Sequence, residues 1–140
     1  MTHGERNYII DKIKDYDIIG LSCYIWNIEI TKQIVALLKQ RKPQLHIFAG
    51  GPEVSFESND LLDLGFDALC CGEGEIAVWE YVKMLDADTS YDVAGMITKQ
   101  YPNQTYQKVD IAYLETLENP YFLAMDEADM GKRYFYFETS

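Results

Sequence analysis

Asp17-Ile18-Ile19-Gly20-Leu21-Ser22 is the stretch of sequence that decides the fold. It is a continuous apolar run of strand length, as expected of a strand that is buried on both faces of a parallel sheet. A helical stretch over 29–41 follows it, with one apolar stripe, and a second strand over 46–50 comes next. Short apolar strands that alternate with helices predict a parallel sheet covered by helices.

The same alternation continues on both sides of this unit. The further predicted elements are helices over 7–14 and 58–64, a strand over 67–71, a helix that opens at Gly72-Glu73-Gly74-Glu75, and a β-hairpin from 93–99 and 105–109 that turns at Pro102-Asn103. The predicted fold class is α/β, a Rossmann-like (flavodoxin-like), mostly parallel sheet with flanking helices and a C-terminal β-hairpin. A doubly wound sheet normally begins with a strand, whereas this chain opens with a helix, so its first strand is expected to be missing.

The composition excludes several classes of function. The chain has 140 residues and a formal net charge of -11, from 12 Lys and Arg against 23 Asp and Glu. An acidic surface repels phosphate backbones, so nucleic-acid binding is not expected, and solubility is the simpler interpretation of the charge. No apolar run approaches the roughly 20 residues that span a bilayer, and the N-terminus lacks the apolar segment of a signal peptide. We therefore expect one compact cytoplasmic domain without membrane contact.

The cysteines and histidines do not form a recognisable reactive site. Cys23, Cys70 and Cys71 make an odd count without a disulfide framework. Cys70 and Cys71 are adjacent in a predicted strand, so their side chains should point to opposite faces and cannot easily bind one metal. His3 is close to the N-terminus, and His46 at a strand start is interpreted as a structural residue. We expect no metal site and no catalytic residue within this chain.

Three loops follow the predicted strands, at the edge where open parallel sheets bind ligands. They are Ser22-Cys23-Tyr24-Ile25-Trp26-Asn27, Gly50-Gly51-Pro52-Glu53-Val54-Ser55 and Gly72-Glu73-Gly74-Glu75. Gly50-Gly51 lets a flat ligand approach the backbone, or forms a tight turn between strand and helix. Ser22 can bind a ligand or cap local backbone groups, and Trp26 can stack on a planar ligand or lie under the next helix.

Gly72-Glu73-Gly74-Glu75-Ile76-Ala77 also matches the G-x-G-x-x-A pattern of dinucleotide sites. Two carboxylates at a helix N-terminus already satisfy the helix dipole and repel a pyrophosphate. The motif also follows the third predicted strand rather than the first. A dinucleotide-binding domain is therefore a distant alternative, and it predicts that NAD stabilises the protein.

At these loops the sequence resembles the N-terminal cobalamin (vitamin B12)-binding domain of radical S-adenosylmethionine proteins. The matching stretches are 16–27, 50–55 and 72–75, and their order and spacing are more specific together than each is alone. Ser22 matches the serine of that domain's Ser-x-Leu motif, Tyr24 replaces the leucine, and Gly50 with Gly51 matches its Gly-Gly. The usual Asp-x-His-x-x-Gly loop is absent. The resemblance therefore implies cobalamin bound base-off, without a histidine as the lower cobalt ligand.

The resemblance further implies that the corrin lies over the strand ends, with the dimethylbenzimidazole tail buried between the sheet and a helix. The cofactor-binding residues implied in this way are Ser22, Cys23, Tyr24, Trp26, Asn27, Gly50, Gly51, Pro52, Glu53, Val54 and Ser55, with Gly72, Glu73, Gly74 and Glu75 at the rim. Methyl transfer or rearrangement is the expected reaction of the full protein. A recognition or lid domain that has lost the cofactor is the alternative within the same class.

The expected domain organisation follows from the same resemblance. Residues 1–100 are the expected cobalamin-binding domain, without most of the opening strand–helix unit of relatives, and 101–133 are a hairpin and linker. Residues 134–140 look like the first strand of a radical S-adenosylmethionine barrel, which would be the partner in cis. The iron–sulfur cluster and S-adenosylmethionine would bind only in the full-length protein. An exposed sheet edge could also pair with another copy of the chain.

Overall fold

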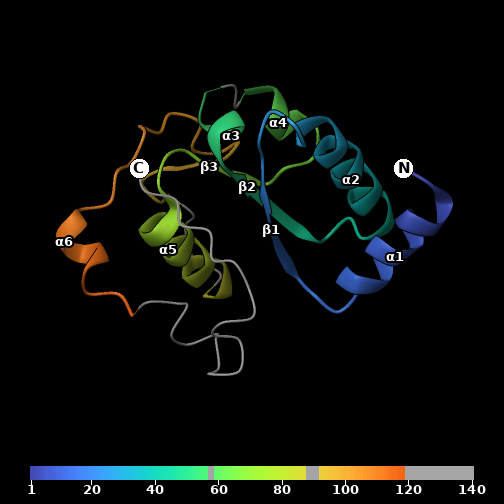
Figure 1. Ribbon diagram of the computed structural model, residues 1–140, viewed down its shortest axis with the longest axis horizontal. Helices are drawn as coiled ribbons and strands as arrows, with labels where there is room; N and C mark the ends of the chain where they lie inside the picture. Colours follow the sequence, from blue (N-terminus) through green and yellow to red (C-terminus); the bar gives the residue numbers. More distant parts are fainter. Residues whose placement is uncertain (57–58, 88–91, 119–140) are drawn as a thin grey trace, which may run out of the picture. The chain divides into compact units, whose positions relative to one another are not determined.

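The computed structural model describes residues 1–56, 59–87 and 92–118 (Figure 1). Within these ranges the helices are α1 (His3–Ile13), α2 (Ile28–Arg41), α3 (Pro52–Phe56), α4 (Asn59–Asp63), α5 (Gly74–Asp86) and α6 (Ile111–Leu114). The strands in the same ranges are β1 (Ile18–Ser22), β2 (His46–Gly50), β3 (Ala68–Cys70) and β4 (Met96–Ile97).

The four strands form one sheet in the order β1-β2-β3-β4. β1, β2 and β3 run parallel, and β4 pairs antiparallel with β3. The register places Gly20 opposite Phe48 and Ser22 opposite Gly50. The predicted α/β class with a mostly parallel sheet and flanking helices is confirmed. The predicted strand over 46–50 has the observed bounds of β2.

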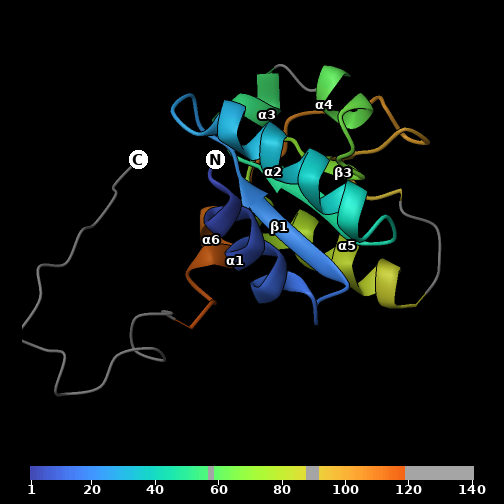
Figure 2. The same cartoon turned by 90° about the vertical axis from the view of Figure 1, so that its right-hand side faces the viewer.

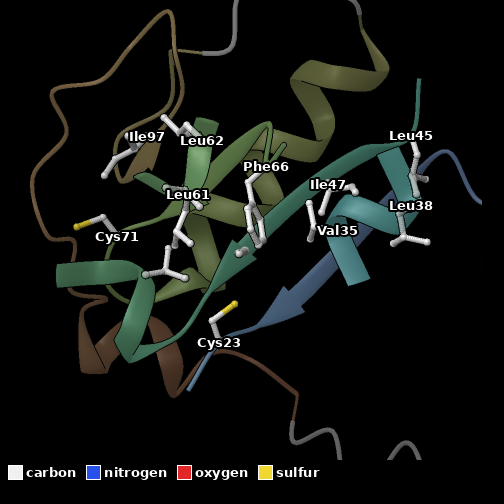
Figure 3. Packing of buried hydrophobic residues seen from close by; sticks show 13 residues of the cluster. Cys23, Val35, Leu38, Leu45, Ile47, Leu61, Leu62, Phe66, Cys71 and Ile97 are labelled. Carbon is white, nitrogen blue, oxygen red and sulfur yellow. The ribbon is translucent and has the colours of Figure 1, made fainter. Parts of the chain in front are cut away.

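Helices cover the two faces of the sheet unequally. Figures 1 and 2 show α2, α3 and α4 on one side and α5 on the other. The larger core lies on the first side, where Ile47 and Ala49 of β2 are completely buried (Figure 3). A smaller core on the α5 side contains Ala68, Cys70 and Tyr81. The alternation of side chains along each strand therefore assigns 18, 20 and 22 of β1 to the α5 side.

Two helical predictions differ from the structure. α1 begins at His3 rather than near 7, because Thr2 and Glu5 form a capping box in which each side chain accepts a hydrogen bond from the other's backbone N–H. The helix expected over 58–64 corresponds to α4, Asn59–Asp63, but the short helix before it, α3, was not predicted. α3 begins at Pro52, whose fixed φ suits the first position of a helix.

The predicted β-hairpin from 93–99 and 105–109 is wrong. β4 pairs with β3, and the chain turns at 98–101, where the Thr98 N–H donates to the Tyr101 carbonyl. The following segment does not return along β4. Gln107 instead forms an isolated parallel bridge with Gly72. Burial of Met96 and Ile97 in the sheet explains this pairing, since a two-stranded hairpin would leave one face of these residues in water.

The chain divides into two compact units, Met1–Lys108 and Val109–Ser140. The sheet and its helices belong to the first. In the second, the described residues contain α6, which begins after Asp110, whose carboxylate accepts a hydrogen bond from the Ala112 N–H. The expectation for 134–140 lies outside the described residues. No helix in the described part of the chain has the length and apolar character needed to cross a membrane.

Candidate functional site

The loop after β1 is held by one side chain. The Asn27 side-chain oxygen Oδ1 accepts a hydrogen bond from the Tyr24 N–H at 2.8 Å, and the side-chain nitrogen Nδ2 donates one to the Ser22 carbonyl at 2.9 Å. The Asn27 N–H itself donates to the Tyr24 carbonyl. The side-chain oxygen and nitrogen of Asn27 are therefore both used inside the loop. Asn27 would affect a ligand by holding Ser22 and Tyr24 in place.

Two aromatic rings project from this loop. Tyr24 and Trp26 stack with their ring centres 4.6 Å apart and their planes within 7° of each other. Trp26 is 77% exposed and therefore does not lie under α2, which excludes one of the two sequence interpretations. A rigid, exposed aromatic pair at a strand end is a platform for a flat ligand, because aromatic surface in water gains from being covered.

Gly51 has a structural reason to be glycine. Its φ is +104°, and a Cβ there would lie 2.5 Å from the Cys23 carbonyl oxygen. The Cys23 backbone is fixed between the two strand ends, since its N–H donates to the Gly50 carbonyl and its oxygen accepts from the Glu53 N–H. Gly51 thus serves the tight turn. Cys23 and Val54 are fully buried in the larger core, so their side chains support the loops from below.

The loop after β3 is tied to two other segments. The Gly72 N–H donates to the Ser55 hydroxyl at 3.2 Å, and the Glu73 N–H donates to the Gln107 carbonyl at 2.9 Å. A Cβ at Gly72, whose φ is +104°, would clash with the same Gln107 carbonyl. The backbone N–H groups of Gly72 and Glu73, which precede α5, therefore already have protein partners. This arrangement argues against the dinucleotide alternative.

Three residues with small side chains or none lie together on the α5 side of β1 and β2, and we call Gly20, Ser22 and Gly50 the bare strip. Gly20 and Ser22 are exposed and Gly50 is half-buried. A Cβ at Gly50 would touch only Cys70, at an ordinary 3.5 Å. The Ser22 hydroxyl has no hydrogen-bond partner among the described residues. The strip therefore offers backbone surface at Ser22 and Gly50 and a free hydroxyl next to the aromatic loop, while the Phe48 ring lies over Gly20.

Gly20 and its neighbour Phe48 are candidate site residues that the sequence analysis missed. A Cβ at Gly20 would lie 2.6 Å from the far end of the Phe48 ring, so the ring extends across β2 onto β1. The signal was present in the sequence. An isolated glycine inside an apolar strand often marks a close approach by a ligand or another group.

Both histidines lie away from this edge. His46 is at the amino end of β2, where its Nε2 is 2.9 Å from the Tyr81 hydroxyl. Burial lowers its pKa; the Asp67 carboxylate partly offsets this effect, and the Lys39 ammonium lowers the pKa further. His3 is the first residue of α1. The contact with Tyr81 agrees with the structural interpretation of His46, which lies at the opposite end of β2 from Gly50.

The three cysteines are buried thiols. Cys70 lies in the smaller core and Cys71 in the larger one, which confirms that the two side chains point to opposite faces. Burial raises the pKa of all three, and it raises the pKa of Cys70 to about 11, with further contributions from Cys71 and Glu75. Within 1–56, 59–87 and 92–118, no group of three or more His, Cys, Asp or Glu side chains could hold a metal ion.

The Cys70 thiol predicts a loss of stability at high pH. Its folded pKa of about 11 lies above an ordinary value of 9, so its contribution is complete below pH 9 and is lost as pH rises to about 11. We expect the free energy of unfolding of the wild type to fall there by on the order of 2 kcal/mol more than that of Cys70→Ala. Urea denaturation at several pH values measures this. Parallel curves for the two proteins would contradict it.

A family model described as the B12 binding domain matches residues 3–82. The matched range contains α1 through β2, both loops that flank the bare strip, β3 and most of α5. All three residues of the bare strip and the Phe48 ring therefore lie inside the matched range.

Two curated proteins are similar over about half of the chain. A cobalamin-dependent radical SAM methyltransferase (TokK) from Streptomyces tokunonensis is 36% identical over 72 residues, which is 50% of this chain and 11% of that protein. A 2-(S-pantetheinyl)-carbapenam-3-carboxylate methyltransferase from Streptantibioticus cattleyicolor is 39% identical over 70 residues, 49% of this chain and 10% of that protein. The chain thus matches about a tenth of the length of each relative.

One solved structure is also similar, the N-terminal domain of a hypothetical protein from Thermotoga maritima. It has a TM-score of 0.47 and 26% sequence identity, and it covers 53% of this chain and 63% of that chain.

Proposed function

This chain belongs to the B12-binding domain family, and from that premise we propose that it holds cobalamin at the carboxyl ends of β1 and β2, on the α5 side of the sheet. The observation that carries the proposal is the bare strip. Two neighbouring parallel strands end there without a large side chain, on a face that is otherwise a packed core. A nucleotide tail laid along the strip would lie against the backbone of the two strands, and the Ser22 hydroxyl is free to bond it.

The aromatic loop suits the corrin itself. The proposed corrin lies over the strand ends, with one face toward the stacked Tyr24 and Trp26 rings. The loop that follows β1 has no histidine that could bind cobalt, so the proposed binding mode is base-off, and Tyr24 and Trp26 would help to hold the corrin. When bound, cobalamin supplies cobalt that can carry a methyl group.

The site residues divide by what the structure lets them do. The residues proposed to contact the cofactor are Gly20, Ser22, Tyr24, Trp26, Gly50, Pro52 and Glu53. The residues proposed to position them are Cys23, Asn27, Gly51, Val54 and Ser55. Gly72, Glu73, Gly74 and Glu75 remain a proposed rim, in which the backbone of Gly72 and Glu73 is held by Ser55 and Gln107.

The proposed activity of the full protein is methyl transfer, which we favour over rearrangement because both curated relatives are named methyltransferases. In this proposal a radical S-adenosylmethionine barrel in cis carries the iron–sulfur cluster and S-adenosylmethionine. The part of the chain described here would present the corrin to that barrel.

Titration of the protein with hydroxocobalamin and methylcobalamin tests the proposal. We expect saturable binding by calorimetry and the absorbance spectrum of base-off cobalamin. NAD should not raise the melting temperature, because the backbone donors before α5 are already bonded. Failure of both corrinoids to bind would favour the cofactor-free lid domain. Stabilisation by NAD alone would favour the dinucleotide site.

A further inference from the structure

The Phe48 ring lies midway along the α5 side of β1 and β2 and packs against the smaller core. Phe48 and Gly20 are direct partners across β1 and β2, and the far end of the ring lies over Gly20. The ring is only half-buried. On the carboxyl side of it lies the bare strip. On the amino side, the next inward-facing residues of the two strands are Ile18 and His46.

Ile18 and His46 belong to a cavity of about 550 Å³ between the amino ends of these strands and the second half of α5. Its other lining residues are Asp17, Trp79, Val82, Lys83, Leu85 and Asp86. Trp79 is 61% exposed, and the Lys83 ammonium lies 5.7 Å from its ring centre. Trp79 therefore gives the cavity a flat aromatic surface, which suits a planar base. The Lys83 ammonium beside it is paired with the Glu80 carboxylate at 3.1 Å, and Asp17 and Asp86 also line the cavity.

The bare strip alone is short for a nucleotide. It runs from Ser22 and Gly50 back to Gly20, which is two residues, or roughly 7 Å at the rise of a strand. A phosphate, a ribose and a bicyclic base placed end to end need a longer slot. The cavity beyond Phe48 lies on the same face of the same strands and would supply the missing length.

We propose that the Phe48 side chain is a gate for the nucleotide tail of the corrinoid, closed over Gly20 in this structure, which swings aside to admit the tail to the cavity at Ile18 and His46. This inference rests on the proposed function. Gly20 makes the movement possible because it has no side chain. When the ring turns to another rotamer, it uncovers only the backbone of β1. The side chain closes over Gly20 without a ligand, since an aromatic ring shields the glycine backbone of a strand from water.

A gate of this kind lowers the apparent affinity for corrinoids that carry a tail. If the open rotamer is a minor state, the observed dissociation constant is the intrinsic one divided by the open fraction. A shorter side chain at 48 removes that penalty. Cobinamide, the corrinoid without a nucleotide tail, never needs the gate to open and should be indifferent to residue 48.

The experiment compares hydroxocobalamin with cobinamide by stopped-flow absorbance and equilibrium titration. Phe48→Leu keeps an apolar side chain but removes the part of the ring that covers Gly20. We expect about a tenfold tighter and faster association with cobalamin and no more than about a twofold change with cobinamide. Phe48→Trp should slow the association with cobalamin and again leave cobinamide unaffected.

Ile47→Val is the matched control, since Ile47 is the next residue of β2 and is buried on the opposite face. Ile47→Val removes core packing but leaves the bare strip and the cavity unchanged, so the affinity for either corrinoid should not change. Weaker binding of cobalamin by Phe48→Leu would overturn the gate and make the ring a stacking surface. Equal effects on cobalamin and cobinamide would overturn it as well. If the wild type binds neither corrinoid, the proposed function itself fails.

Discussion

Replacement of Ser22 by Phe is expected to lower the affinity of the protein for cobalamin by at least about 100-fold, which corresponds to roughly 2.8 kcal/mol. Ser22 is exposed and ends β1 on the bare strip, so an aromatic ring there fills the space that the proposed tail would occupy. Phe favours strands, and the Ser22 hydroxyl has no partner among the described residues. The stability of the fold should therefore change by less than about 0.5 kcal/mol.

Two further variants separate blockage from other effects. Ser22→Ala leaves the strip open and removes only the hydroxyl, so its affinity should fall by about fivefold, as for one hydrogen bond. Gln33→Phe adds the same ring to an exposed position of α2, on the other side of the sheet, and should bind cobalamin like the wild type. Absorbance titration measures all three. Normal binding by Ser22→Phe would place the cofactor elsewhere.

Gly51→Ala is expected to destabilise the protein by about 3 kcal/mol or more. The new methyl group would lie 2.5 Å from the Cys23 carbonyl oxygen, and a φ of +104° is unfavourable for alanine. The Cys23 backbone cannot easily retreat, because its N–H donates to the Gly50 carbonyl at 2.7 Å. Urea denaturation followed by circular dichroism measures the loss.

Gly4→Ala is the control for this substitution. No atom lies within 4 Å of a Cβ at Gly4, which is in the first turn of α1, so the variant should be as stable as the wild type or more stable by up to about 0.5 kcal/mol. A loss below about 1 kcal/mol for Gly51→Ala would show that the two strand ends are less tightly joined than the structure indicates. A substitution at Gly51 is in any case a poor probe of ligand binding, because unfolding would remove the site as well.

The strand–helix alternation from Asp17 to Gly50 could be predicted because its signals are local. Each strand is a short apolar run, and each helix has its own stripe and its own end signals. The three loops could be placed at one edge for the same reason, since parallel strands point their carboxyl ends the same way. The hairpin prediction failed because pairing is not local. Met96 and Ile97 find a better partner in β3 than in the segment near Gln107.

Within the candidate site, the residue types were visible but their tasks were not. Gly51 and Gly72 look like room for a ligand, yet each accommodates a carbonyl of the chain itself, from Cys23 and from Gln107. Asn27 looks like a ligand-binding side chain, yet its amide closes its own loop. In each case the contact depends on how closely two backbone segments approach each other. That distance cannot be read from either segment alone.

The sequence by itself therefore determined the class of sheet, the edge that carries the loops and the family resemblance. The first two depend on short local patterns, and the resemblance depends on the order and spacing of three short stretches. Only the tertiary structure decided which surface is open. The register of β1 against β2 places Gly20 beside Phe48 and Ser22 beside Gly50, and the side of the sheet that α5 leaves uncovered makes this row accessible. The strand register and the part of the sheet that a helix covers both arise from the packing of distant segments. Each side chain competes for space with neighbours from other parts of the chain, which the local sequence does not reveal.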